Sequence, residues 1–216
     1  MSYVDGYVLP QSIAEIFAAN KQNDIPVLTG WNEDEGISSA PPKTADEFKA
    51  QLKERYGDGA GDFAKHYPAS NDEEAARSQQ SLGRDQTFGS QNYTWAQRQS
   101  TGGKSKIYVY RFTRKLPATG DYVKFGAFHT GEVAYAYDNL DFVKRCPWEP
   151  VDRELATLMS SYWANFARSG DPNGKNLPNW PAYNSTESMV MVFAEKSGAR
   201  PLPDKAALEF LVSKMK

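Results

Sequence analysis

The feature that most constrains the fold of this chain is a pair of short apolar segments, residues 25–30 (IPVLTG) and 106–112 (KIYVYRF). The first is bounded by Asp24 and Gly30, which is typical of a buried strand. The second has the β-branched and aromatic content that favours a strand. The residues between them are numerous, mostly polar and carry helix signals. A connection of this length and kind is typical of a helical crossover between parallel strands rather than of a hairpin. We therefore predict two adjacent, parallel strands joined by a right-handed helical connection over residues 37–100.

Helix signals occupy much of the remaining sequence. Glu follows three residues after Ser12, Thr44 and Asn71, which is the spacing of a helix start. Apolar residues recur at helical spacing after Asp152, which we interpret as the cap of another helix. The resulting prediction places helices at 12–20, 44–56, 71–99, from Asp152 to the turn at 169–174, and at 204–216, with a break at 57–62 and a short strand at 188–193 beside the second strand.

Composition argues against several classes of function. The formal net charge is −2, whereas a nucleic-acid binder is expected to have an excess of basic residues. No apolar run approaches the roughly 18 residues of a membrane span. The single cysteine, Cys146, cannot form an internal disulfide, and no His/Cys cluster has metal-ligand spacing. We expect no nucleic-acid or membrane partner, no metal and no organic cofactor.

Two loops that follow the predicted strands contain candidate catalytic residues. Glu33, Asp34 and Glu35 follow the first strand, and His129 lies beyond the second. Functional residues of open α/β sheets gather at the carboxyl ends of the strands. A carboxylate there could orient an imidazole that acts as a general base. On composition and spacing alone, a solvated acidic loop and a structural histidine are the more usual interpretations of these residues, and His66 has no partner motif.

Longer stretches of the sequence resemble a known family. In chain order they are VDGYVLP (4–10), IPVLTGWNEDEG (25–36), FGAFHTGEVAYAY (125–137) and YWANFARSGDPNG with WPAY (162–174 and 180–183). Together they resemble the C-terminal portion of type-B carboxylesterases, the cholinesterase-like branch of the α/β hydrolases, with bacterial para-nitrobenzyl esterases most similar. The resemblance implies an α/β fold: a single incomplete α/β-hydrolase C-terminal domain over 1–216, with a small, mostly parallel sheet flanked by many helices and a helical insertion at about 37–105.

The resemblance also implies roles for individual residues. The family uses a Ser–Glu–His triad. Its acid lies between Asp and Gly in the acidic loop, which corresponds to Glu35, and its histidine lies in the G-A-F-H segment, which corresponds to His129. Glu132 and Asp85 match further acidic positions of the family, and we interpret both as structural.

The sequence departs from the family pattern in one large respect. None of its serines has Gly at both −2 and +2, so the G-x-S-x-G elbow of the nucleophile is absent, as is the glycine motif of the oxyanion hole. We therefore expect a C-terminal fragment of a serine carboxylic ester hydrolase that is inactive by itself. Its expected partners are the missing N-terminal half and a small-molecule carboxylic ester. We expect Trp31 to pack in the interior rather than to line a pocket.

Two other functions stay open at this point. Cholinesterase-like adhesion proteins keep the fold but lose triad members, so a non-catalytic binding module is one alternative. A separate interaction domain that self-associates through an exposed strand edge is another. The resemblance favours export, because many family members are secreted or periplasmic, although composition does not fix the localisation.

Overall fold

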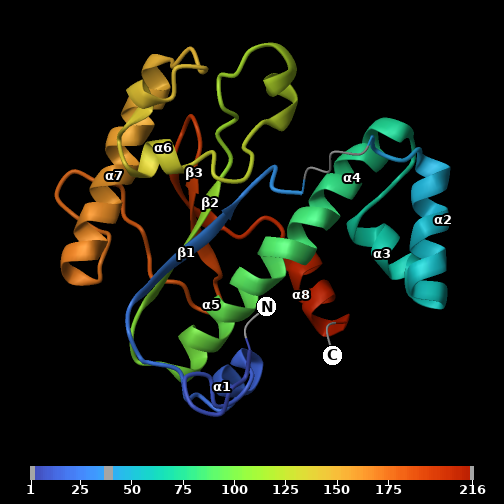
Figure 1. Cartoon of the computed structure of the whole chain (residues 1–216), viewed down its shortest axis with the longest axis horizontal. Coiled ribbons are helices and arrows are strands. Elements are labelled where there is room, and N and C mark those ends of the chain that lie inside the picture. Colours follow the sequence, from blue (N-terminus) through green and yellow to red (C-terminus); the bar gives the residue numbers. More distant parts are fainter. Residues whose placement is uncertain (1–2, 37–40, 215–216) are drawn as a thin grey trace.

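The computed structural model describes residues 3–36 and 41–214, which form an α/β structure around one sheet (Figure 1). The sheet has the strand order β1-β2-β3-β4, in which β1, β2 and β3 run parallel and β4 is antiparallel to β3. The predicted parallel pair and its third strand are therefore confirmed, whereas β4 was not predicted. The strands are β1 (Val27–Asn32), β2 (Ile107–Phe112), β3 (Met189–Phe193) and β4 (Gly198–Pro201).

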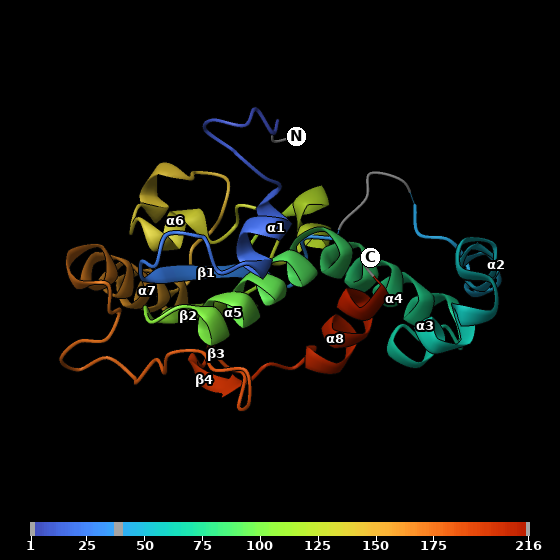
Figure 2. The same cartoon turned by 90° about the horizontal axis from the view of Figure 1, so that it is seen from below.

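Helices cover both faces of the sheet because β2 is apolar on both sides. Tyr108 and Phe112 pack against α6 (Val133–Ala136) and α7 (Pro150–Ser169). Ile107 and Val109 point to the opposite face and pack in a second cluster with residues of α5 and α8. Figures 1 and 2 show α7 on one side of the strands and α5 with α8 on the other. The helices on this second side are α5 (Ser90–Gly102) and α8 (Lys205–Lys214).

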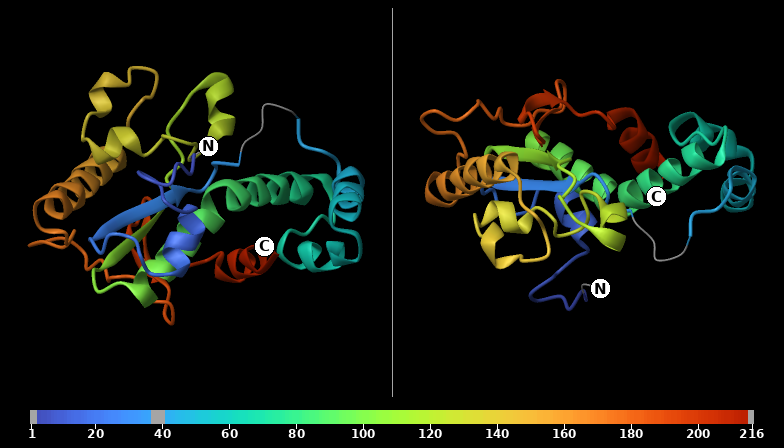
Figure 3. Two further views of the ribbon diagram at one scale, coloured as in Figure 1. Left: turned by 60° about the horizontal axis from the view of Figure 1, so that its bottom comes forward. Right: turned by 90° about the horizontal axis from the view of Figure 1, so that it is seen from above.

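The helical connection between β1 and β2 forms a third apolar cluster at one end of the molecule (Figure 3). Phe48, Phe63 and Tyr67 are buried there together with Leu211 of α8. The predicted helix starts at Ser12, Thr44 and Asn71 are confirmed, since each side chain accepts a hydrogen bond from the glutamate amide three residues later. The helices concerned, with α3 between them, are α1 (Ile13–Ala18), α2 (Ala45–Tyr56), α3 (Ala60–His66) and α4 (Asp72–Arg84).

Three predictions about helices were wrong in detail. The helix predicted at 71–99 is divided by a π-helical turn, Asp85–Gly89, and then continues as α5 to Gly102. The break predicted at 57–62 is real only at its start, because Gly57 has a positive φ while α3 begins at Ala60. Short 3₁₀ turns occupy Gly57–Gly59, Gly120–Phe125 and Leu140–Phe142.

The start of α7 is the third difference. Asp152 is not the N-cap of this helix, which begins at Pro150 after the N-cap residue Glu149; the fixed φ of proline suits a first helical position. Asp152 lies in the first turn, and its carboxylate accepts a hydrogen bond from the amide of Glu149 at 2.9 Å. That contact is one half of a capping box with Glu149, and the same carboxylate also binds Arg114, so Asp152 serves both the helix start and a buried ion pair.

The sheet brings the ends of β1 and β2 together. Asn32 and Phe112, the last residues of these strands, are register partners, so both following loops begin at one edge of the sheet. Among the strands of the described residues, β1 and β4 each have a single neighbour, so β1 is one of the two edge strands of the sheet. Ile25, directly before this edge, is 59% exposed. Across 3–36 and 41–214, no helix is long and apolar enough to cross a membrane.

Candidate active site

Glu35 and His129 meet at the carboxyl ends of β1 and β2. The distance between Glu35 Oε1 and His129 Nδ1 is 2.9 Å, so the contact predicted from the two loops is confirmed. The other carboxylate oxygen of Glu35 accepts a hydrogen bond from the amide of Asn32 at 2.9 Å. The Glu35 side chain is only 5% exposed, whereas that of His129 is 63% exposed. The pair thus has a buried acid and an imidazole that is open to solvent.

Burial raises the pKa of Glu35 above its ordinary value. The hydrogen bonds from His129 and from the Asn32 amide favour the charged carboxylate and act against that rise, while the nearby charge of Glu132 adds to it. A carboxylate that is removed from water costs free energy unless it accepts hydrogen bonds from the protein. The Nδ1–H group of His129 donates one such bond, which favours one tautomer of the ring.

Asp34 connects the two loops that carry the pair. Its amide donates to the carbonyl of Ala127 at 3.0 Å, and its Oδ2 accepts from the amide of Ala127 at 2.8 Å. Gly126 is required beside this contact, because its φ is +57° and a Cβ there would overlap the Asp34 carboxylate. The side chain of Gln80 in α4 donates to the other oxygen of Asp34 at 2.9 Å. The loops are therefore held in register with each other and with α4.

Glu132 lies beside the pair. Among the described residues, no hydrogen bond joins its carboxylate to the imidazole of His129. Its carboxylate accepts from the side-chain amide of Asn32, which is fully buried and also donates to the carbonyl of Phe128 at 2.8 Å. Glu132 is thus bound to the residue that also donates to Glu35, and the structural role of Glu132 stays a prediction. The part played by Asn32 was missed, although its place one residue before the acidic run was a usable signal.

Phe88 is a second residue that sequence reasoning missed. Its ring stacks on the imidazole of His129 with 4.9 Å between ring centroids and 22° between the planes. Phe88 belongs to the π-helical turn, a feature that is frequent at functional sites and that the sequence pattern of one long helix concealed. Stacking on one face leaves the ring less freedom to rotate.

The other sequence candidates lie outside the pair. His66 stacks on Phe210 at 4.9 Å between centroids and has no carboxylate partner recorded in the described part of the chain. Trp31 is 1% exposed and packs in the interior, as predicted. Asp85 is also buried and binds Arg84 at 2.7 Å, in agreement with the structural role predicted for it. None of the described residues forms a group of three or more His, Cys, Asp or Glu side chains suited to a metal ion.

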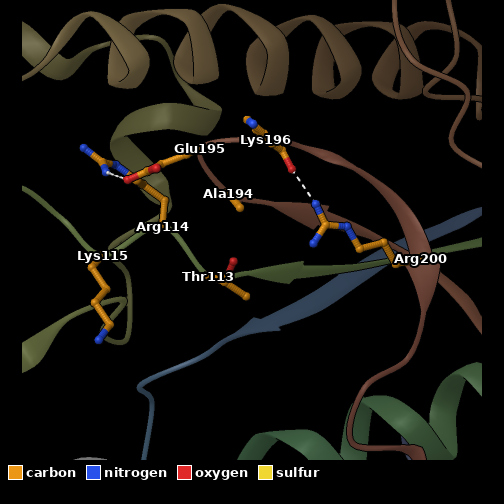
Figure 4. A pocket seen from close by; sticks show the side chains of 7 residues that line it. All are labelled: Thr113, Arg114, Lys115, Ala194, Glu195, Lys196 and Arg200. Carbon is orange, nitrogen blue, oxygen red and sulfur yellow. Dashed lines mark hydrogen bonds and ion pairs between the residues drawn. The ribbon is translucent and has the colours of Figure 1, made fainter.

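A shallow hollow of about 440 Å³ lies beyond the ends of β2 and β3 (Figure 4). Its lining includes neither Glu35 nor His129. Arg114 on one side of it is bound to Glu195 at 2.9 Å, and Arg200 on the other side donates to the carbonyl of Lys196 at 2.7 Å. The residues that line it are Thr113, Arg114, Lys115, Ala194, Glu195, Lys196 and Arg200.

Comparison with known proteins identifies the family to which the chain belongs. The sequence model of the carboxylesterase family matches residues 1–211. Similar curated proteins include fumonisin B1 esterase of Sphingopyxis macrogoltabida, which is 30% identical over 91% of the chain. Liver carboxylesterase 1 of Oryctolagus cuniculus is 27% identical over 94% of the chain, and phenmedipham hydrolase of Pseudarthrobacter oxydans is 26% identical over 88%. The chain belongs to the carboxylesterase family.

The match covers only part of each relative. The chain spans 37% of the length of the fumonisin B1 esterase, 39% of the liver carboxylesterase and 40% of the phenmedipham hydrolase. The match therefore shows the family of this chain over somewhat more than a third of the length of each relative.

Proposed function

We propose that this chain supplies the acid and the base of a Ser–Glu–His triad in a serine carboxylic ester hydrolase. The observation that carries the proposal is the 2.9 Å contact between the buried carboxylate of Glu35 and Nδ1 of the exposed imidazole of His129. In hydrolases with a Ser–His–acid triad, a carboxylate orients the imidazole that acts as the general base. The two positions are also those at which the resemblance to type-B carboxylesterases places the triad acid and histidine.

In this proposal, Nδ1–H of His129 donates to Glu35, which leaves Nε2 unprotonated. Nε2 then takes the proton of the serine hydroxyl as the oxygen attacks the ester carbonyl, and later gives it to the leaving alcohol. The carboxylate of Glu35 stabilises the imidazolium that forms between these steps. It keeps the ring in the required tautomer without itself taking the proton.

The nucleophile and the oxyanion hole would come from residues outside these 216. No serine in this sequence has the glycine spacing of the nucleophile elbow. We infer that the chain alone has no esterase activity above a trace, because it lacks the attacking atom and the main electrostatic stabilisation. The N-terminal half of the same protein would be its partner, with the unpaired edge of β1 as one place of contact.

Mutagenesis of the intact protein tests this proposal, with hydrolysis of a para-nitrophenyl ester as the measurement. The coding sequence upstream should contain a G-x-S-x-G segment in the same reading frame. His129→Ala should lower turnover by about 10⁴-fold or more, and Glu35→Gln by about 10²- to 10⁴-fold, because the base and its orienting charge are lost. His66→Ala is the matched control and should change little. An intact protein that kept most of its turnover without His129 would contradict the triad.

A non-catalytic adhesion module is the alternative from a different class. Such modules lose triad members, whereas both members that this chain could contribute are present and in contact. This retention favours the enzyme. Specific binding to another protein, combined with no ester hydrolysis by the intact protein, would favour the module.

A further inference from the structure

A buried ionic cluster lies directly behind the loop that carries Glu35. Its centre is formed by two arginines, Arg84 at the end of α4 and Arg111 in β2, whose side chains are 3% and 1% exposed. Both bind the carboxylate of Glu33, which is two residues before Glu35. Arg84 contacts Glu33 Oε1 at 3.0 Å, and Arg111 contacts Oε2 at 2.9 Å. We call these two guanidinium groups and the Glu33 carboxylate the arginine clamp.

The clamp also holds the backbone of the loop. Arg111 Nη1 donates to the carbonyl of Asn32 and Arg84 Nη1 donates to the carbonyl of Glu33, both at 3.3 Å. These are the residues that set the direction in which the chain leaves β1. Asn32 also donates its own amide to Glu35. Arg111 thus binds the carbonyl of Asn32, and the amide of the same residue binds the Glu35 carboxylate. A change in the clamp that moves the backbone of Asn32 therefore moves a hydrogen-bond donor of Glu35.

The far end of the loop is fixed by the same helix. A Cβ on Gly36 would overlap the carbonyl oxygen of Gln80 and the amide nitrogen of Arg84, so the glycine lies directly against the backbone of α4. Glu35 is thus held between two fixed points, the clamp at Glu33 and the close packing at Gly36. The helix then continues through the π-helical turn to Phe88, which stacks on His129.

The remaining members of the cluster fix the arginines themselves. Asp204, directly before α8, places Oδ2 at 2.9 Å from Arg84 and 2.7 Å from Arg111, and so bridges the two cations. Asp85 binds Nε of Arg84 and accepts a hydrogen bond from the hydroxyl of Tyr67 at 3.0 Å. A buried ionic cluster adds little stability over apolar packing, because desolvation offsets the attraction. Its geometry, in contrast, is strongly specified, since each planar guanidinium has fixed donor directions.

We propose that Arg84 and Arg111 are positioning residues of the acid–base pair, which act through Glu33 and Asn32 to hold the Glu35 carboxylate on Nδ1 of His129. The inference rests on the proposed function, because it names what keeps the triad acid in place. Neither arginine touches the imidazole through a recorded contact within the described residues, so their effect is indirect.

The test is nitrogen-15 NMR of the imidazole of His129 in the 216-residue chain, at a pH where the ring is neutral. The wild-type chain should show the Nδ1–H tautomer alone. Arg84→Lys keeps the charge but cannot reach Glu33, Asp85 and Asp204 together, so it should give a mixture of both tautomers. Glu33→Asp keeps the charge but is one methylene too short to span both arginines, and it should have the same effect.

Glu195→Gln is the matched control. Glu195 also binds a buried arginine, Arg114, at 2.9 Å, but it lies away from the loop. The tautomer should stay unchanged in this variant. In the intact protein, Arg84→Lys should lower kcat by about 10²-fold and leave KM nearly unchanged, because a displacement of about 1 Å at the pair costs that much.

The outcomes separate the clamp from the triad. A mixture of tautomers in the wild-type chain would contradict the Glu35–His129 pair and with it the proposed function. A single tautomer in the wild type that persists in folded Arg84→Lys and Glu33→Asp would overturn the clamp alone. If Arg84→Lys does not fold, as judged by circular dichroism, Glu33→Asp decides, since its side chain is 40% exposed. A mixture in Glu195→Gln would also count against the clamp.

Discussion

Two buried arginine clusters lie near the carboxyl end of β2, and they bind different parts of the molecule. Arg84 and Arg111 contact the loop after β1, which carries Glu35. Arg114, two residues after β2, donates to Asp152 at 2.8 Å and to Glu149 at 2.6 Å at the start of α7, and to Glu195 after β3. The first cluster therefore connects three elements to a candidate catalytic residue, whereas the second connects the sheet to a helix.

The difference shows that a buried charge cluster is not by itself evidence of a functional site. Asp152 is fully buried and also accepts a hydrogen bond from the hydroxyl of Tyr135 at 2.8 Å. The ion pairs of Arg114 and this hydrogen bond therefore fix α7 to the sheet and to α6. The hydrogen bonds from Arg114 and from Tyr135 help to hold the pKa of Asp152 below its ordinary value despite its burial. What distinguishes the other cluster is its place directly behind Glu35. Perturbing the two clusters should therefore separate stability from catalytic geometry.

The largest loss of stability is expected from Arg114→Met. The substitution keeps much of the side-chain volume but leaves the buried carboxylate of Asp152 without its cation. We expect the free energy of unfolding to fall by about 3–5 kcal/mol, measured by urea denaturation. The folded fraction should keep a single His129 tautomer, because the side-chain partners of Arg114 among the described residues are Glu149, Asp152 and Glu195, none of which belongs to the loop. A loss below 1 kcal/mol would show that Asp152 does not depend on this pair.

Gly36→Ala should have the next largest effect, and it should act on the site as well. The added methyl group would overlap the backbone of α4 at Gln80, so the loop must shift. We expect a loss of about 1–3 kcal/mol in the free energy of unfolding, together with a mixture of His129 tautomers. Gly61→Ala is the matched control, because a Cβ there meets nothing within 4 Å. In α3 the alanine should stabilise the chain by about 0.5–1 kcal/mol.

The sequence predicted those parts of the molecule that depend on local patterns. The segment at 106–112 became β2 and that at 25–30 became β1, although β1 starts and ends two residues later than predicted, at Val27 and Asn32; the polar chain between them was correctly interpreted as helical. The contact of Glu35 with His129 was predictable because parallel strands bring their carboxyl ends to one edge, whatever the separation in sequence. Resemblance to a family then identified which acid of the loop to choose.

The clamp could not be predicted in the same way. Arg84 lies 51 residues from Glu33 and 120 from Asp204, so no local pattern indicates that these charges meet. The π-helical turn that places Phe88 on His129 was hidden because its residues also fit an ordinary helix. β4 was missed because the strand is only four residues long and none of its residues is buried, so it has no apolar pattern.

Glu35→Gln should change the way in which the free energy of unfolding depends on pH more than it changes the magnitude of that free energy. Burial raises the pKa of Glu35, so the folded state binds the proton at a higher pH than the unfolded state does. Its contribution to stability is then fully present below the unfolded pKa and is lost as pH rises through the folded pKa. The glutamine does not titrate. Relative to the wild type, the variant should therefore gain stability as pH rises from about 4 to 7, even though the intact protein loses turnover. Parallel pH profiles from urea denaturation would contradict this.

The smallest effect is expected from Glu195→Gln, which completes the comparison between the two clusters. Glu195 is 73% exposed, and its bond to Arg114 is one of several that this arginine makes. An ion pair with one exposed partner contributes about 0–1 kcal/mol and is screened by salt. The free energy of unfolding should therefore fall by less than about 1 kcal/mol, and the difference from the wild type should shrink further in 0.5 M salt. Glu33→Asp should cost similarly little stability but should change the His129 spectrum. If Glu195→Gln and Glu33→Asp change the His129 spectrum equally, the arginine clamp does not control the catalytic pair any more than the cluster around Arg114 does.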